Sequence, residues 1–322
     1  MWKTVARRFL ILIPQLFVLS ILIFFLGYLM PGDALRGRIG PGTTLEQLEM
    51  MREVLGLNDP WYVQYASWMR GIFTEFDFGR SFIQHRPTTE VIGERIVNTM
   101  RLSFLAMVFT YAIALPLGIL AARKKDRWPD KSIMMYTFFA LSIPSLILGL
   151  FMVLIFGFRL QWFPTGGTVT IASDMAGGLT RFFSQMYHAV LPAISLALIS
   201  TVGIIYFLRS EIIDNDTSDF VTTARAKGVP EGKVYTGHIL RNAVLPIAGS
   251  FGGIFSALFA GTVFIERVFS FGGMGDLFIS SIMMQDWPVA NTLIMFYAVT
   301  GVVAVLMTDL FIMIVDPRIR IK

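Results

Sequence analysis

The sequence contains no cysteine, and few of its residues carry a charge. Without cysteine the chain cannot form disulfides, thiolate metal sites or a cysteine nucleophile, and the redox compartment cannot be read from cysteine usage. Of its 322 residues 55% are hydrophobic and only 15% are charged, whereas soluble domains have about 25% charged residues. This composition predicts a protein that resides in a membrane.

Ionisable side chains are also nearly missing from the long apolar runs. Asp309 near the end of the last run is the exception, and we interpret it as a helix-end residue paired with nearby Arg or Lys. Ion-coupled carriers hold charged or protonatable groups at membrane depth, so this pattern disfavours an ion-coupled secondary transporter. The runs lie near residues 9–29, 102–122, 133–158, 189–208, 243–265 and 291–315.

The sequence offers no catalytic or metal site. His85, His188 and His238 fall in an outer segment, at an outer helix end and in an inner loop, so no two of them can share a metal or complete a triad. A membrane enzyme would need an acid, a base or a nucleophile gathered at one depth. We therefore predict that the chain is not an enzyme and holds no metal or cofactor of its own.

The chain also lacks a usable phosphate-binding loop. The nearest match begins at Gly228 and ends at Val234, but it is one residue short and has Val234 where Ser or Thr binds Mg²⁺. Pro230 removes one of the backbone N–H groups that would hold a phosphate. An energy source outside this chain is therefore expected.

Six apolar runs of this length predict an all-α, polytopic protein with six transmembrane helices. The first run, residues 9–30, is longer than a signal-peptide core and has no small-residue cleavage site after it, so we expect it to remain as a span. The predicted parts are residues 1–30 with the N-terminus and first helix, an extracytoplasmic helical segment 31–101, and a five-helix core 102–322 with the inner loop 209–242.

Basic residues predict the orientation. Of the 27 Lys and Arg residues, 16 lie in the N-terminus, the 123–131 loop, the 209–242 loop and the C-terminus, which fall on one side of a six-span chain. Because Lys and Arg mark cytoplasmic loops, both termini are predicted to be cytoplasmic. Their place at the ends of apolar runs argues against nucleic-acid binding, despite the net charge of +5.

The outer segment 31–101 is predicted to be helical. Thr43 and Glu46 can form a capping box for a helix that ends at Gly56, and a second helix follows Pro60. The second helix carries aromatic residues that suit a membrane interface or the docking of a partner: Trp61, Tyr62, Tyr65 and Trp68.

The inner loop contains two short helix patterns that meet at a glycine. Asp219 is a candidate N-cap for the first helix, Gly228 suits a left-handed position after it, and Pro230 can open the second. The pattern favours a helix-turn-helix that protrudes from the membrane as a docking element. The alternative is an ordinary solvated loop between two spans.

Small polar residues and prolines are the other features of the spans. Prolines lie in or at the end of the first five runs, where they bend helices and free carbonyl groups. The hydroxyl residues can either line a neutral pathway or serve helix packing: Ser142, Ser145, Ser195, Ser200, Thr201, Ser250 and Ser256. After the fifth run, a glycine turn at 269–275 precedes a predicted amphipathic half-helix at the outer surface.

Short motifs are spread over almost the whole chain: Arg7-Arg8, Pro31-Gly32-Asp33, Asp77 to Ser81, Ala140 to Ser145, Thr222 to Gly228, Leu245-Pro246, Phe269 to Gly275 and Asp316-Pro317-Arg318. Together they resemble the permease subunits of dipeptide and oligopeptide ABC importers. The segment Thr222 to Gly228 is similar to the EAA loop of these permeases, although only Ala226 and Gly228 match its short pattern. Gly272 departs from the family, which usually has proline there.

This resemblance implies a B-type permease that works with other subunits. The implied partners are a second, C-type permease, two ABC ATPase subunits that hold the ATP and Mg²⁺, an extracytoplasmic peptide-binding protein and membrane lipid. The residues implied to couple to the ATPase are Asp219, Phe220, Thr222, Thr223, Ala224, Arg225, Ala226, Lys227, Gly228 and Glu231. A nickel, glutathione or other small-solute importer of the same type is the alternative, and the resemblance implies a bacterial or archaeal cell membrane.

Overall fold

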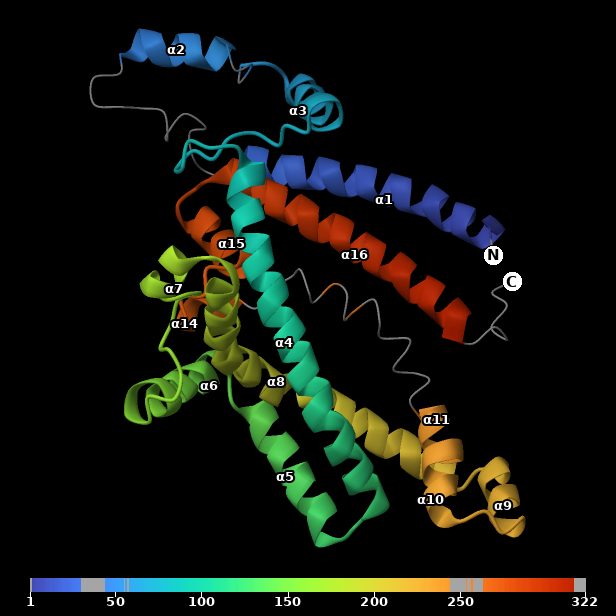
Figure 1. The fold of residues 1–322 in the computed structure, drawn as a ribbon. Helices are drawn as coiled ribbons and strands as arrows, with labels where there is room; N and C mark the ends of the chain where they lie inside the picture. The colour runs from blue at the N-terminus through green and yellow to red at the C-terminus, as the bar shows by residue number, and fades with distance from the viewer. Residues whose placement is uncertain are drawn as a thin grey trace. The chain divides into compact units, whose positions relative to one another are not determined.

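The computed structural model describes residues 2–29, 44–54, 56, 58–243, 253, 256 and 263–315. Within them the secondary structure is helical, apart from one isolated bridge between Arg80 and Pro87. The all-α prediction is therefore confirmed for the described residues (Figure 1). The predicted stretches Pro31-Gly32-Asp33, Leu245-Pro246 and Asp316-Pro317-Arg318, and Ser250, lie outside them.

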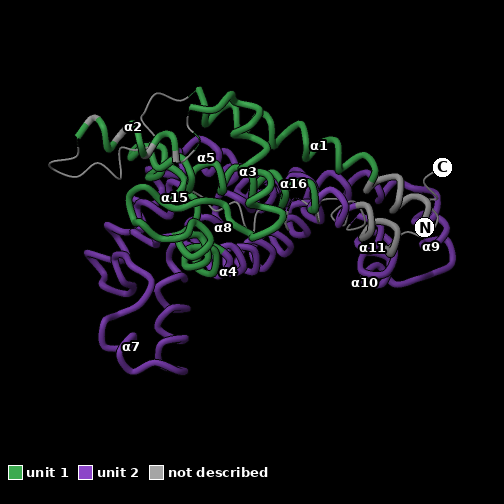
Figure 2. Tube along the Cα trace, turned by 90° about the horizontal axis from the view of Figure 1, so that it is seen from above, with its two compact units in different colours: residues 1–99, 273–303 green, residues 100–272, 304–322 purple. Residues whose placement is uncertain are grey.

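The chain divides into two compact units, which Figure 2 distinguishes by colour. Unit 1 comprises residues 1–99 and 273–303, and unit 2 comprises residues 100–272 and 304–322. Two of the three boundaries fall within long helices, α4 (Thr88–Arg123) and α16 (Trp287–Val315), and the third falls between residues 272 and 273. Each unit is described on its own below.

Four single helices are long and apolar enough to cross a membrane: α1 (Trp2–Leu29), α4, α8 (Gly178–Asp216) and α16. A fifth crossing is possible where α5 (Trp128–Ser142) is followed by α6 (Ser145–Met152) and the π-helix η2 (Val153–Arg159). The described residues thus give four or five spans, and they do not test the predicted total of six. Most of the remaining predicted run, 243–265, lies outside the described residues.

The predicted span 133–158 is not one continuous helix. Its two halves meet at an angle of 103°, at a break between Ser142 and Ser145. The break follows from Pro144, because proline disfavours helical backbone in the residue before it, and Ile143 is extended with φ −92° and ψ 119°. This stretch is therefore a broken span or a re-entrant loop.

In unit 1, aromatic side chains join α3 (Trp61–Glu75) to α1. The ring of Tyr65 lies 5.5 Å from that of Phe24, and its hydroxyl is 2.7 Å from the Ser20 hydroxyl. The ring of Trp61 lies 5.1 Å from that of Phe25. The aromatic face of α3 thus packs on α1, a contact that the sequence did not predict.

The helix before α3 begins one residue later than predicted. α2 spans Leu45–Val54, and its capping box is formed by Thr44 and Gln47: the Thr44 amide donates to Oε1 of Gln47, and the Gln47 amide donates to Oγ1 of Thr44. The predicted pair of Thr43 and Glu46 was therefore wrong by one position, and Thr43 itself lies outside the described residues.

Another part of unit 1 fastens the loop before α4 to the corner between α15 (Met274–Met283) and α16. The carboxylate of Asp286 is only 4% exposed and accepts hydrogen bonds from the Ser81 hydroxyl at 2.5 Å and the Phe82 amide at 2.9 Å. Asp77 accepts a bond from the Gly79 amide, which fixes the turn that leads into this contact. The stretch Asp77 to Ser81 is thus a structural clasp, and α15 is the short helix predicted after the glycine turn.

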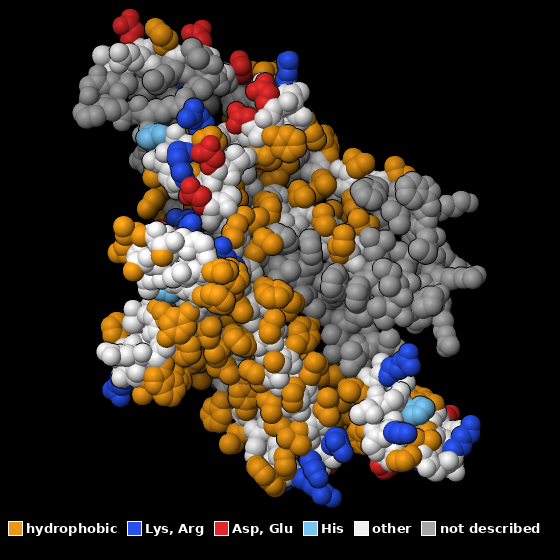
Figure 3. Space-filling model, viewed as in Figure 1, with side chains coloured by type: hydrophobic (Ala, Val, Ile, Leu, Met, Phe, Trp, Pro, Cys, Tyr) orange, Lys and Arg blue, Asp and Glu red, His pale blue; other side chains and the backbone are white. Residues whose placement is uncertain are grey.

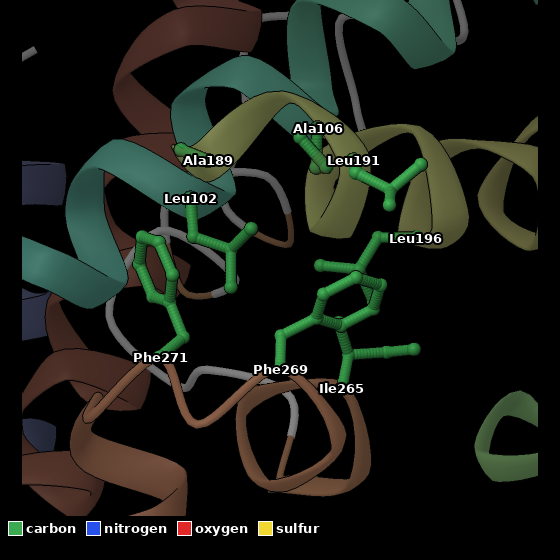
Figure 4. Packing of buried hydrophobic residues seen from close by; sticks show 9 residues of the cluster. Leu102, Ala106, Ala189, Leu191, Leu196, Ile265, Phe269 and Phe271 are labelled. Atoms are coloured by element: carbon green, nitrogen blue, oxygen red, sulfur yellow. The ribbon is translucent and has the colours of Figure 1, made fainter. Parts of the chain in front are cut away.

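In unit 2, the core packs α8 against α4 and α14 (Val263–Val268). Ala189 and Ala193 of α8 are fully buried, and their small side chains let neighbouring helices approach closely. Figure 4 shows the larger side chains of this cluster. They come from three helices and the turn after α14: Leu102, Leu191, Leu196, Ile265, Phe269 and Phe271.

A buried ion pair joins the start of α5 to the far end of α8. Nε and Nη2 of Arg209 donate to the two carboxylate oxygens of Asp130, both at 2.7 Å, and Asp130 also accepts a bond from the Asp126 amide. The Asp130 side chain is only 3% exposed. Since a buried carboxylate left without its partner is costly, this bidentate pair fixes how α5 and α8 meet.

Candidate coupling segment

The two helix patterns of the inner loop form a helix-turn-helix at the end of α8 (Figure 1). The first helix, α9, spans Asp219–Ala226, and the second, α10, spans Glu231–Lys233. α10 continues into a π-helical turn, η3 (Val234–Ile239), and then into α11 (Leu240–Ala243). We call residues 216–243 the coupling segment.

Gly228 ends α9 in the way the sequence predicted. Its φ is +73°, a left-handed conformation that glycine adopts without strain. The Gly228 amide donates to the carbonyl of Arg225 at 2.9 Å, and the Val229 amide donates to the carbonyl of Ala224 at 3.2 Å. These two bonds are those of a Schellman motif, which turns the chain sharply at the end of a helix.

The predicted helix starts were each wrong by one residue. Ser218 occupies the N-cap position of α9, with extended backbone, and Asp219 is the first helical residue. Asp219 still suits the first turn, because a negative charge there is favourable with the helix dipole. Pro230 is the N-cap of α10 rather than its first helical residue.

Apolar side chains hold the underside of the segment to the membrane helices. Val221 and Ala224, three residues apart on one face of α9, are buried with Val234 and Ile239. The same cluster contains Ile212 of α8 and Ala122 at the end of α4. This cluster therefore packs α9 against the ends of α4 and α8.

A cation–π contact adds a second link to α4. The guanidinium carbon of Arg123 lies 5.2 Å from the ring centroid of Tyr235 in η3. Partial burial raises the pKa of the Tyr235 phenol above its usual value, with the carboxylate of Asp216 acting in the same direction.

The outer face of the helix-turn-helix is polar and exposed. Of the ten predicted coupling residues only Ala224 is buried, and Phe220 presents a large apolar side chain that is 40% exposed. The hydroxyls of Thr222 and Thr223 donate to carbonyls of the preceding turn. The exposed face therefore offers an aromatic side chain, two threonine methyl groups and the charge of Lys227 to a partner.

Arg225 is the most heavily bonded residue of the segment. Nε donates to Glu231 at 2.7 Å, while Nη2 donates to the carboxylate of Asp216 at 2.6 Å and Nη1 to its carbonyl at 3.2 Å. The hydrogen bond to Glu231 is the largest cause that raises the pKa of Arg225 above its usual value, and the hydrogen bond to Asp216 is the next largest. Local sequence patterns do not show which side chains of three different helices meet, so this network was not predicted.

Basic side chains gather at the same end of unit 2. Figure 3 shows Lys and Arg near the α4–α5 turn and on the coupling segment, while apolar side chains cover the helix surface next to the α4–α5 turn. The α4–α5 turn carries Arg123, Lys124, Lys125, Arg127 and Lys131. A polar, basic end next to an apolar surface is typical of a membrane boundary.

The structure separates the predicted pathway residues into different environments. Ser195 and Thr201 are fully buried: the Ser195 hydroxyl donates to the carbonyl of Leu191, and Thr201 lies 2.8 Å from the hydroxyl of Tyr136. Ser142 and Ser200 are exposed, whereas Ser145 and Ser256 are partly exposed. Ser142 and Ser145 flank the 103° break between α5 and α6.

A cavity of about 360 Å³ lies in unit 1, between the start of α4 and α16. Its lining is almost entirely apolar and includes Ile92, Ile96, Met295 and Phe296. Gly93 adds open space, since a Cβ there would meet no atom within 4 Å. None of the predicted pathway residues lines this cavity.

Two buried polar residues were not among the predicted site residues. Glu266 in α14 is 0% exposed, just beyond the predicted span 243–265. His188 is 7% exposed; its Nδ1 is 3.2 Å from the carbonyl of Gly167, and its Nε2 is buried with no hydrogen-bond partner in the described part of the chain. The described residues contain no group of three His, Cys, Asp or Glu side chains suited to a metal.

Comparison with known proteins matches nearly the whole chain. The family described as "Binding-protein-dependent transport system inner membrane component" matches residues 114–321, and the family described as "Binding-prot-dependent transport system membrane comp, N-term" matches residues 1–103. The oligopeptide transport system permease protein AppB of Bacillus subtilis (strain 168) is 35% identical over 317 residues, which cover 98% of each protein. The glutathione transport system permease protein GsiC of Escherichia coli (strain K12) is 32% identical over 322 residues, the full length of both.

A solved structure resembles the fold. One chain of the MetNI methionine ABC transporter, solved in inward-facing conformations, superimposes on this protein with a TM-score of 0.56 at 14% sequence identity. The match covers 71% of this chain and 97% of the transporter chain. At this identity the likeness concerns the fold alone.

Proposed function

Because this chain belongs to the family of inner membrane components of binding-protein-dependent transport systems, we propose that it carries di- and oligopeptides across the membrane for an ATP-driven ABC importer. It is a multi-pass inner membrane protein and a permease subunit. The observation that carries the proposal is the helix-turn-helix of the coupling segment, whose apolar underside packs on α4 and α8 while its outer face stays exposed.

The proposed partners follow from this division of labour. An extracytoplasmic binding protein delivers the peptide, two ATPase subunits bind ATP and Mg²⁺, and a second, C-type permease completes the pathway. This chain contributes no catalytic residue and no cofactor of its own. Its part is to convert movement at the coupling segment into movement of the spans, and the exposed face around Phe220 and Lys227 receives the ATPase.

The cargo follows from the bound ligand of the partner binding protein. We expect mass spectrometry of the binding protein that co-purifies with this permease to detect short peptides of mixed sequence. The reason is that the hydroxyl residues predicted to line the pathway are neutral and would not select peptides with one kind of charged side chain. Glutathione as the main ligand would favour the second candidate, since GsiC is named a glutathione permease and is 32% identical to this chain. Nickel, or another small solute, in place of peptides would contradict a peptide importer.

The proposed orientation places both termini and the loop 209–242 in the cytoplasm. Because the chain lacks cysteine, single cysteines introduced at Asn215 and in the outer loop at His85 can be labelled without background. We expect a membrane-impermeant thiol reagent added to intact cells to label position 85 and not position 215, since Lys and Arg concentrate around the latter. Labelling of position 215 from outside would contradict both the orientation and ATPase docking there.

A further inference from the structure

Arg225 joins three separate elements of the coupling segment. It lies in the last turn of α9, and its guanidinium bonds to Glu231 in the first turn of α10 and to Asp216 at the end of α8. A third bond reaches the main-chain carbonyl of Asp216. A planar guanidinium has a rigid fork of donors, so one side chain that satisfies two carboxylates and a carbonyl fixes directions as well as distances.

Besides Arg225, the Schellman turn and the apolar cluster beneath it link α9 to the second helix. The part of that helix nearest the turn, α10, has only three residues before it continues into η3. The turn between α9 and α10 contains Gly228, which has no side chain to pack. Beneath it, α9 contributes the side chains of Val221 and Ala224, which are small.

We propose that Arg225 is a positioning residue, which fixes the angle between α9 and α10 and ties both to α8, rather than a residue that contacts the ATPase. This inference rests on the proposed function, because it assigns the segment the task of transmitting a push from the ATPase. The donors that an ATPase carboxylate would need are already occupied by Asp216 and Glu231. Arg225 thus leaves the docking surface to Phe220, Thr222, Thr223 and Lys227.

Magnitudes favour orientation over stability as the role of this network. Exposed ion pairs contribute little to folding, and the side chains of Arg225 and Glu231 are 36% and 62% exposed. A three-membered network with hydrogen bonds of 2.6 and 2.7 Å still restricts geometry, because bending α10 away from α9 breaks several bonds at once. Removing Arg225 should therefore loosen the segment without unfolding the protein.

A distance measurement on the full-length permease, without ATPase, tests this directly. The absence of cysteine allows spin labels to be attached through Thr222→Cys on α9 and Gly232→Cys on α10, two exposed positions. By pulsed electron paramagnetic resonance in lipid nanodiscs, we expect Arg225→Ala to widen the distance distribution by roughly twofold. Arg225→Lys should give an intermediate width, because an ammonium group cannot make the forked contact.

A second variant guards against a misfolded protein. The pair Asp216→Asn and Glu231→Gln keeps Arg225 and nearly the same side-chain volumes but removes both negative charges, so it should widen the distribution like Arg225→Ala. Lys233→Ala, which removes an exposed charge from α10, should leave the width unchanged. Each variant should elute as the monodisperse parent protein does.

The full importer gives the functional readout. With ATPases, second permease and binding protein reconstituted, we expect Arg225→Ala to keep the ATPases bound but to raise the ATP hydrolysed per substrate imported several-fold. An unchanged distance distribution in Arg225→Ala would overturn the positioning role. If the distribution widens but the wild-type permease captures no ATPase, the proposed function fails while the positioning role of Arg225 stands.

Discussion

Replacement of Gly228 with valine is expected to abolish substrate uptake while the permease still inserts and folds. Gly228 has φ +73°, and a Cβ built there meets no atom within 4 Å, so the obstacle is the backbone conformation and not lack of space. A β-branched residue held in this conformation costs about 1 to 3 kcal/mol. The segment avoids this strain by opening the Schellman turn, which tilts α10 against α9 and removes the docking geometry.

A graded series at this position sharpens the prediction. Asparagine tolerates the left-handed conformation better than other residues, so Gly228→Asn should retain the most uptake, Gly228→Ala less and Gly228→Val none. Gly232 provides the matched control, because it lies four residues away in α10, has open space around a Cβ and needs no positive φ. Gly232→Ala should therefore transport normally.

The measurement is uptake by the reconstituted importer together with substrate-stimulated ATP hydrolysis and co-purification of the ATPase. Membrane abundance of each variant serves as the folding control. Normal coupling by Gly228→Val at normal abundance would mean that the segment is an ordinary solvated loop, the alternative that the sequence left open. Equal losses in Gly228→Val and Gly232→Ala would mean that the loss does not arise from the backbone conformation.

Local signals made the coupling segment predictable. Helix ends are encoded in few neighbouring residues, and both the left-handed Gly228 and the proline at the start of the second helix appear in the structure. The errors at Ser218 and Pro230 were of one residue, as expected where several residues in a row can cap a helix. What these residues do in transport stays a prediction.

Proline shows why the path of the spans was harder to predict. Pro144 breaks its helix with a bend of 103°, whereas Pro116 and Pro192 lie inside the continuous helices α4 and α8. The residue is the same in the three positions. Packing of neighbouring helices decides whether a helix can continue through a proline, and a hydropathy profile carries no information on such packing.

Long-range polar contacts were not predictable for a similar reason. Asp286 and Ser81 are 205 residues apart, and Asp130 and Arg209 are 79 apart. Each of these residues alone resembles an ordinary polar residue of a loop or helix end. Their pairing depends on the tertiary fold, and a single sequence does not record which distant residues meet.

Uptake by the complete importer is expected to require ATP and to be independent of proton and sodium gradients. In the sequence, Asp309 is the ionisable residue within the six apolar runs, so the spans offer almost no interior group whose charge could follow an ion gradient. In vesicles with ATP trapped inside, a protonophore should leave the initial rate unchanged. Without ATP, uptake should fall to background at any gradient.

Glu266 is a second acidic residue that this prediction has to take into account, because its carboxylate is fully buried just beyond the run 243–265. If it serves structure, Glu266→Gln keeps the shape of the side chain and leaves uptake driven by ATP and insensitive to protonophore, even if protein yield falls. Asp309→Asn should behave in the same way. A wild-type rate that collapses with the gradient at constant ATP, and a Glu266→Gln or Asp309→Asn variant that no longer responds to it, would identify a proton site and make the chain an ion-coupled carrier. Uptake that depends on ATP alone would mean that a partner ATPase supplies the energy. This is the expected result, because the chain exposes a coupling segment and its sequence contains no usable phosphate-binding loop.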